Sequence, residues 1–302
     1  PPLSCGWRPF IWFYRCNREE FEAVTIMSAR LADAIERAEI AYMVDRMAAI
    51  AGRPGNPEGV ETARFGDRVA LFSRTMPWPM FNTVKGIREP DAAALDDILA
   101  FYRNRDRKAQ FELVPGLADA AWFGLLAERG FRQSGFHTSM YAVLEEWRPA
   151  DSAWNQDERI SIRALGEWEF ETYAAIHCRG TGLPVDGIPH VAANNRVLCG
   201  RPGWRFYLAS YEGVPAAVGV MHQAEGVASM TFAATLPAFR NRGLQSALLN
   251  KRLDEAARSG CKLAVSQCAY LSSSHRNMER AGMKIGYVRS TWTSAESSRS
   301  QR

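Results

Sequence analysis

The feature that most constrains the fold is a short basic stretch with one glycine, residues 240–245, between a predicted strand and a predicted helix. It reads Arg-Asn-Arg-Gly-Leu-Gln and follows an apolar, strand-like run over residues 227–235. Apolar residues then recur at helical spacing, as Leu244, Ala247, Leu248 and Leu253. Glycine permits a tight turn, and the first N–H groups of a helix lack partners at the positive end of its dipole. The stretch therefore predicts a phosphate or pyrophosphate site at a helix start.

This stretch resembles the pyrophosphate loop of the GNAT (Gcn5-related N-acetyltransferase) superfamily, usually written Q/R-x-x-G-x-G/A. Arg240 takes the first position and Gly243 the obligatory glycine, while Gln245 stands where a small residue is commoner. The residues that follow extend the resemblance. A second strand-like run at residues 262–268 leads into residues 274–283, which resemble the last helix of GNAT domains and the glycine that follows it. The resemblance therefore covers most of the C-terminal half of the chain.

Chain length and a faint internal repeat favour two domains. The 302 residues are long for one ordinary domain, and residues 127–131 resemble residues 278–283. We predict an α/β (α+β) fold of two GNAT-like domains in tandem, each a mixed, mostly antiparallel twisted sheet flanked by helices. We expect an N-terminal extension outside the fold at residues 1–27 and a degenerate GNAT-like domain at residues 28–148. A linker at residues 149–159 would lead to an acetyl-CoA-binding GNAT domain at residues 160–292, followed by a flexible tail at residues 293–302.

The residues before the first helical pattern are unlike a folded segment. An aromatic run at residues 10–14 lies between Arg8 and Arg15 and is too short and bulky for a signal peptide. Met27 and Ser28 directly precede the helical pattern, so we expect that translation can begin at Met27. N-terminal mass spectrometry of the native protein tests this, and residues found before Met27 would contradict it.

The first domain is predicted not to bind CoA. Where the second half has residues 240–245, the first has residues 85–91. Glu89 and Asp91 would repel a pyrophosphate, and Pro90 has no N–H to donate. The first domain then has four open roles: completing the core, covering the substrate cleft, mediating pairing, or support alone.

The resemblance implies how the second domain holds acetyl-CoA. The strands at residues 227–235 and 262–268 would separate, and the pantetheine arm would lie between them against backbone near Ala234 and Thr235. Backbone N–H groups would hold the pyrophosphate, from Arg242, Gly243, Leu244, Gln245 and Ser246. The side chains of Arg240 and Arg242 would add positive charge, and Ser274 and Asn277 would contact the CoA arm. Helix capping is an equally open role for Ser274.

The catalytic residues are less well marked. Many members of the superfamily place a glutamate on the strand before the loop, but residues 230–234 contain no acid. They also commonly place a tyrosine in the last helix, where this chain has Met278. Tyr270 and Tyr287 are the nearest substitutes as proton donors, and His222 is a candidate base because its reference pKa lies near neutrality. Packing roles remain open for all three.

Two further groups of side chains carry weaker signals. His177 and Cys178 are neighbours in sequence, and adjacent residues of a helix do not face each other, so a catalytic pair is disfavoured against core or surface packing. Three aromatic residues are candidates to line an acceptor pocket or to pack in the core, namely Trp168, Trp204 and Tyr207.

Composition limits the classes of molecule that the protein is expected to bind. The net charge of +4 is spread along the chain, no nucleic-acid motif is present, and no apolar run is long enough for a membrane span, so we predict no nucleic-acid or membrane partner. The six cysteines and five histidines show no metal or disulfide spacing, which predicts no metal and a reduced, cytoplasmic setting.

The predicted function is a cytoplasmic N-acetyltransferase that moves an acetyl group from acetyl-CoA to a primary amine by direct attack. Its partner would be a small-molecule or peptide amine, with a homodimer left open. The alternative is a non-catalytic acyl-CoA-binding sensor, favoured by the absent glutamate and by Met278. A third hypothesis is an interaction protein in which both domains are structural.

Overall fold

The computed structural model describes residues 26–76, 78–148 and 157–295, so most of the predicted extension, linker and tail lies outside the described residues. The helices are α1 (Ala29–Ala51), α2 (Ala92–Arg103), α3 (Ala121–Glu128), α4 (Phe170–Thr181), α5 (Ile188–Arg196), α6 (Leu244–Arg258) and α7 (Ser273–Arg280). The strands are β1 (Val60–Phe65), β2 (Arg68–Ser73), β3 (Thr83–Lys85), β4 (Gln110–Leu113), β5 (Phe131–Val143), β6 (Ile160–Ala164), β7 (Trp204–Tyr211), β8 (Val214–Ala224), β9 (Val227–Thr235), β10 (Leu263–Cys268) and β11 (Lys284–Ser294).

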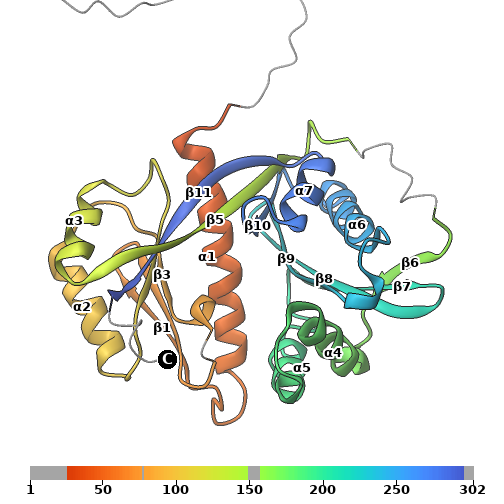
Figure 1. The fold of residues 1–302 in the computed structure, drawn as a ribbon, viewed down its shortest axis with the longest axis horizontal. Coiled ribbons are helices and arrows are strands. Elements are labelled where there is room, and N and C mark those ends of the chain that lie inside the picture. Colours follow the sequence, from red (N-terminus) through yellow and green to blue (C-terminus); the bar gives the residue numbers. More distant parts are fainter. Residues whose placement is uncertain (1–25, 77, 149–156, 296–302) are drawn as a thin grey trace, which may run out of the picture.

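The strands of the described residues form one continuous, twisted sheet (Figure 1) in the order β1-β2-β3-β4-β11-β5-β10-β9-β8-β7-β6. Pairing is antiparallel except between β3 and β4 and between β9 and β10. The predicted mixed, mostly antiparallel sheet flanked by helices is confirmed. The two halves differ from the prediction in sharing a single sheet.

The two halves exchange their last strands. β5 from the first half pairs with β10, and β11 from the end of the chain pairs with β4. β5 and β11 also pair with each other along most of their length. Because each half needs the other's strand to complete its sheet, folding of the two halves is coupled, and the predicted domain division stays a prediction.

Side chains alternate between the two faces of the sheet, and both faces are covered. On one face, α1, α4 and α5 share a core with apolar residues such as Val69, Leu71, Val218 and Val220. On the other face, α2 and α3 cover the first half, and α6 and α7 cover the second. Neighbouring positions on a strand point to opposite faces, which is why strands such as β2 and β7 are buried almost throughout. In Figure 1, α1 lies across the middle of the sheet.

Local sequence signals explain most element boundaries. Ser28 caps α1, with its Oγ accepting from the Leu31 N–H at 3.2 Å, and the chain enters a turn at Gly52. β5 begins at Phe131 despite its polar first half, because that half pairs with β11. β11 continues to Ser294, so the first two residues of the predicted tail are strand. Met27, assigned to the extension, packs against the core around α1.

A close approach between α4 and the end of β9 depends on Gly180. A Cβ at this position would lie 2.9 Å from both Ala234 Cβ and the Thr235 carbonyl oxygen. Gly180→Ala is therefore expected to lower the free energy of unfolding by about 1–3 kcal/mol, measured by urea denaturation. The control is Gly187→Ala, where the added Cβ meets nothing within 4 Å. Equal stability of the two variants would contradict the prediction.

Candidate functional site

β9 and β10 separate halfway along their length, as the resemblance implied. They pair in parallel from Val227 and Leu263 to Met230 and Ser266, and no further. Beyond that point β9 bulges against β8, and Phe232 adopts φ 46, a left-handed conformation that is uncommon for a bulky residue. The β10-facing edge of β9 is therefore left without a strand partner over its last residues.

The turn before α6 presents N–H groups without protein partners. Gly243, at φ 80, is the N-cap, and Asn241 is also left-handed at φ 61. The first loop carbonyl to accept from α6 is that of Gly243, which bonds the Ala247 N–H at 2.9 Å. Among the described residues, no hydrogen bond is formed by the five predicted N–H donors, those of Arg242, Gly243, Leu244, Gln245 and Ser246. An anion at this helix start would meet unpaired donors and the positive end of the dipole.

The side chains of the loop are engaged elsewhere. Arg240 donates from Nη2 to the Gly180 carbonyl at 2.9 Å. The Arg242 guanidinium lies 4.7 Å from the ring centre of Tyr211 and 5.3 Å from that of Phe239. Gln245 donates from Nε2 to Thr235 Oγ1 at 2.8 Å, which ties the first turn of α6 to the end of β9. Arg240 is thus bound to another protein group, whereas the backbone N–H groups and the Arg242 guanidinium, which forms no hydrogen bond among the described residues, can bind an anion.

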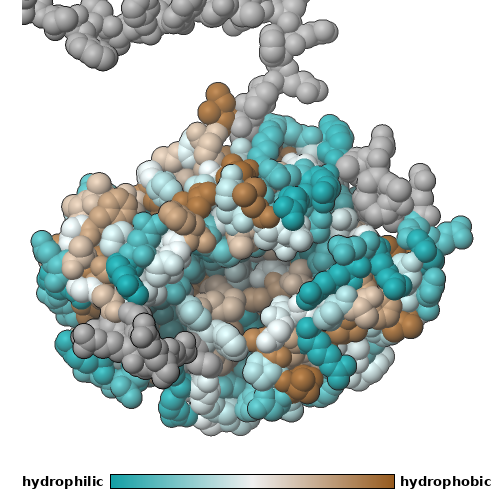
Figure 2. Space-filling view, in the orientation of Figure 1, coloured by the Kyte–Doolittle hydropathy of each residue, from teal (hydrophilic) through white to brown (hydrophobic). Residues whose placement is uncertain are grey.

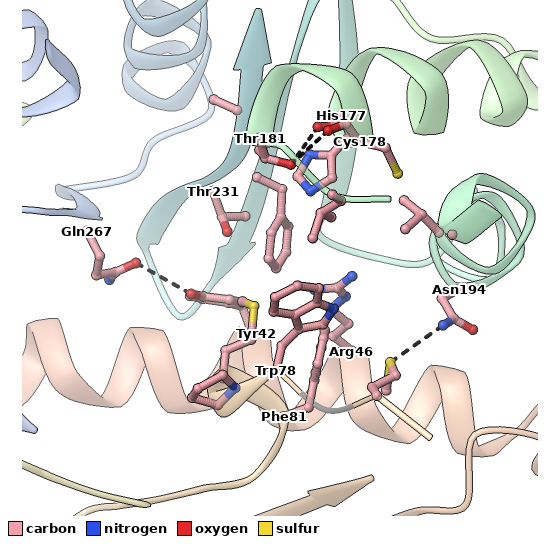
Figure 3. Close-up of a pocket in the computed structure, with 18 of the residues that line it drawn as sticks. Tyr42, Arg46, Trp78, Phe81, His177, Cys178, Thr181, Asn194, Thr231 and Gln267 are labelled. Carbon is pink, nitrogen blue, oxygen red and sulfur yellow. Dashed lines mark hydrogen bonds between the residues drawn. The ribbon is translucent and has the colours of Figure 1, made fainter. Parts of the chain in front are cut away.

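A cavity of about 970 Å³ lies between the two halves of the chain. Figure 2 shows it as a hollow in the middle of the molecular face, and Figure 3 shows its interior. The C-terminal half contributes residues of β9, β10, α6 and α7, including Met230, Thr231, Ala233, Gln245, Gln267, Ser274, Asn277 and Met278. The N-terminal half contributes residues of α1, of the turn between α1 and β1, and of the segment after β2, including Tyr42, Arg46, Glu58, Trp78 and Phe81. The cavity thus runs from the gap between β9 and β10 to the surface of α1.

Five of the ten residues predicted to contact CoA lie in the cavity wall or beside it. Gln245, Ser274 and Asn277 line the cavity, and Ala234 and Thr235 are buried beside it at the end of β9. Ser274 follows the α7 cap, since the Ser272 Oγ accepts from the His275 N–H at 3.1 Å. The structure therefore leaves the Ser274 side chain available to the cavity, and the cap is at Ser272.

The three catalytic candidates are not among the residues that line the cavity. His222 is buried on β8 with its ring 4.7 Å from that of Trp204, and burial lowers its pKa. Tyr270 is 54% exposed, with its ring 5.2 Å from that of His275. Tyr287 is buried in β11, and burial raises its pKa. The structure does not bring these three residues together.

Several cavity residues were not predicted from the sequence. His177 lines the cavity, stacks on Tyr173 at 5.7 Å, and leaves Nδ1 without a partner in the described residues. Burial, with a smaller effect from Arg46, lowers the pKa of His177 to about 4. Tyr42 and Arg46 are four residues apart on α1 and so share one helix face, a signal visible only once α1 is known to border the site.

The corresponding loop of the first half is filled by protein groups. The Gly86 N–H donates to Glu36 Oε1 at 3.1 Å, and Arg88 binds Glu36 as well. Asp91 caps α2 by accepting from the Ala94 N–H at 2.9 Å. A carboxylate of α1 thus takes the place that an anionic ligand would occupy.

Comparison with known proteins agrees with this geometry. Residues 164–283 match the family model described as the acetyltransferase (GNAT) family. No curated protein sequence matches the chain. Among the described residues, no helix is both long and apolar enough to cross a membrane.

Solved structures share the fold at low identity. A GCN5-related N-acetyltransferase from Kribbella flavida is 18% identical, with 83% of this chain and 95% of that chain covered and a TM-score of 0.58. One from Sphaerobacter thermophilus is 17% identical, with coverages of 88% and 90% and a TM-score of 0.57. A tandem GNAT protein from the clavulanic acid biosynthesis pathway is 18% identical, with coverages of 86% and 95% and a TM-score of 0.57.

The C-terminal half of this chain is a GNAT-family domain, and family and fold together support N-acetyltransferase activity in general terms.

Proposed function

We propose that the protein transfers the acetyl group of acetyl-CoA to a primary amine by direct attack, with acetyl-CoA held by the C-terminal half. The proposal is supported mainly by the geometry around the end of β9. The gap between β9 and β10, flanked by the unbonded N–H groups at the start of α6, opens into the cavity between the two halves. This arrangement offers one route from a pyrophosphate site to an enclosed acceptor site.

The backbone of the C-terminal half supplies the binding groups for acetyl-CoA. The N–H groups of residues 242–246 are positioned to take the pyrophosphate, and the free edge of β9 beyond Met230 can pair with the amides of the pantetheine arm. Ser274 and Asn277 of α7 line the same side of the cavity and can bond the arm. The thioester would then lie near the β9 bulge at Phe232.

Direct attack needs an unprotonated amine and a proton source for the departing thiolate. His177 faces this part of the cavity (Figure 3), and its low pKa keeps the imidazole neutral at pH 7, so that Nδ1, which has no partner in the described residues, can accept a hydrogen bond from the attacking amine. Met278 has no proton to give, so we assign this role to the Ser274 hydroxyl, which is on the same helix and also lines the cavity. His222 and Tyr270 stay predictions that require indirect roles.

Calorimetry and a thiol-release assay with an amine panel test the proposal. We expect one acetyl-CoA site per chain, because protein groups fill the loop of the first half. We also expect CoA thiol release that depends on the amine. Binding without release for any amine would favour the acyl-CoA sensor, for which Met278 is the motivating observation. Absence of binding would overturn both.

A further inference from the structure

Arg46 is a buried cation without a protein partner. Its residue is 6% exposed on α1, and it lines the cavity. Among the described residues it forms no ion pair and no hydrogen bond, and its Nε is buried without a partner. Figure 3 shows the side chain extending from α1 into the cavity. An uncompensated charge in such a place is costly, and buried charges in proteins are normally paired.

Two aromatic rings hold the guanidinium in place. Its central carbon lies 4.1 Å from the ring centre of Phe232 and 5.1 Å from that of Phe81. Contacts of this kind favour a fixed orientation for the planar group while leaving its N–H donors unused. Burial lowers the pKa of Arg46, and the phenols of Tyr173 and Tyr42 oppose this effect. The protein thus positions the guanidinium without neutralising it.

Two other charged groups of the cavity wall, Arg252 and Glu58, are already satisfied by protein groups. Arg252 is equally buried, but it donates to the carbonyls of Leu248 at 3.0 Å and Val220 at 2.9 Å. Glu58 binds Thr75, accepts from Asn194 Nδ2 at 3.0 Å and faces Arg53 at 3.4 Å. Of the two arginines in the described cavity wall, Arg46 is therefore the one whose N–H donors have no protein partner.

We propose that Arg46 binds a carboxylate on the acceptor, so that the amine acetylated by this protein is an amino acid or a compound of that class. This inference rests on the proposed function and specifies its acceptor. The guanidinium fork matches a carboxylate with two parallel hydrogen bonds. A single positive charge balances a single carboxylate, whereas a phosphate dianion would leave one charge unmatched in the cavity.

The position of Arg46 also limits the distance between acid and amine. Its guanidinium lies over Phe232, the residue at the β9 bulge beside which the amine must approach the thioester. The carboxylate and the reacting nitrogen are thus close together, as they are in an α-amino acid. Apolar groups that also line the cavity, such as Met76, Met80 and Trp78, suit an apolar side chain.

Matched acceptor pairs test the proposal. Leucine and leucinamide, and phenylalanine and phenylalaninamide, differ only in whether the acid is present. We expect the wild-type protein to prefer the acid of each pair by about 50-fold in kcat/KM, and Arg46→Met to abolish that preference, because a hydrogen-bonded charge pair is worth about 10- to 100-fold. Arg46→Lys keeps the charge without the fork and should retain part of the preference. Equal losses for acids and amides in Arg46→Met, or no wild-type preference, would overturn the proposal.

Calorimetry separates this inference from the proposed function. The acid and amide of each pair are titrated into the protein saturated with CoA, so no turnover is needed. Binding of the acids to wild-type protein and not to Arg46→Met supports the carboxylate site even when no thiol is released, in which case only the proposed function fails. Acids that bind both proteins alike overturn the inference. Unchanged acetyl-CoA affinity in Arg46→Met shows that the variant is folded.

Discussion

Arg289→Met is expected to lower the free energy of unfolding by about 3–5 kcal/mol, because it removes one member of a buried charge network. Arg289 of β11 binds Glu39 of α1 and lies 3.1 Å from Glu112 of β4. Lys85 of β3 binds both carboxylates, at 2.8 Å from Glu39. The Arg289 Nη2 also lies 2.8 Å from His137 Nδ1. Without Arg289, two buried carboxylates would share one lysine.

The network joins parts of the chain that are distant in sequence, so its loss should affect the fold as a whole. Urea denaturation measures the change, and Arg129→Met is the control because its partner Asp96 is a surface residue. The control should differ little from wild type. A loss in Arg289→Met no larger than that of the control would contradict a stabilising role for the network.

The same network predicts the direction of acid sensitivity. Burial would raise the pKa of Glu39, but the charges of Arg289 and Lys85 outweigh it and hold the pKa at about 2, below the ordinary 4.5. A carboxylate with a lowered folded-state pKa stabilises the fold above its unfolded pKa, and this stability is lost as the pH falls from about 4.5 towards 2. Arg289→Met should therefore show a weaker dependence on pH in that range.

The secondary structure of the C-terminal half could be predicted from its sequence because the sequence signals there are local. The turn at Gly243, the helix stripe after it and the strand-like runs before and after it depend on neighbours in the chain. They predicted the helix start with its free N–H groups in the right place, and the family resemblance implied the separated strands. The exchange of β5 and β11 left no such signal, since strand pairing over such sequence distances is set by tertiary packing.

The acceptor side of the site could not be predicted for the same reason. Tyr42 and Arg46 look like ordinary residues of an amphipathic helix, and only the crossing of α1 beside β9 places them in the cavity. His177 was assigned to core or surface because it does not face Cys178, yet its environment is set by Tyr173 and by the cavity. His222, chosen for its reference pKa, lies instead against Trp204.

Ser246→Asp is expected to weaken acetyl-CoA binding by about 1000-fold without harming the fold. Ser246 is the third residue of α6 after the Gly243 cap, and its N–H has no partner in the described residues. A carboxylate at this position favours the helix, because it lies near the positive end of the dipole. It would repel a pyrophosphate at the same N–H groups. At about 4 Å and partial exposure, repulsion by one phosphate charge is on the order of 4 kcal/mol.

Ser246→Asp is a better test than a substitution of Gly243, because it is expected to lower the affinity for acetyl-CoA without lowering the stability of the fold. Gly243 has φ 80, so any side chain there strains the turn and confuses binding with folding. Ala93→Asp is the matched control, since it adds the same carboxylate to the first turn of α2. Calorimetry should show wild-type acetyl-CoA affinity for the control, and thermal melting should show no loss of stability in either variant. Wild-type affinity in Ser246→Asp would mean that the pyrophosphate lies elsewhere than at the start of α6.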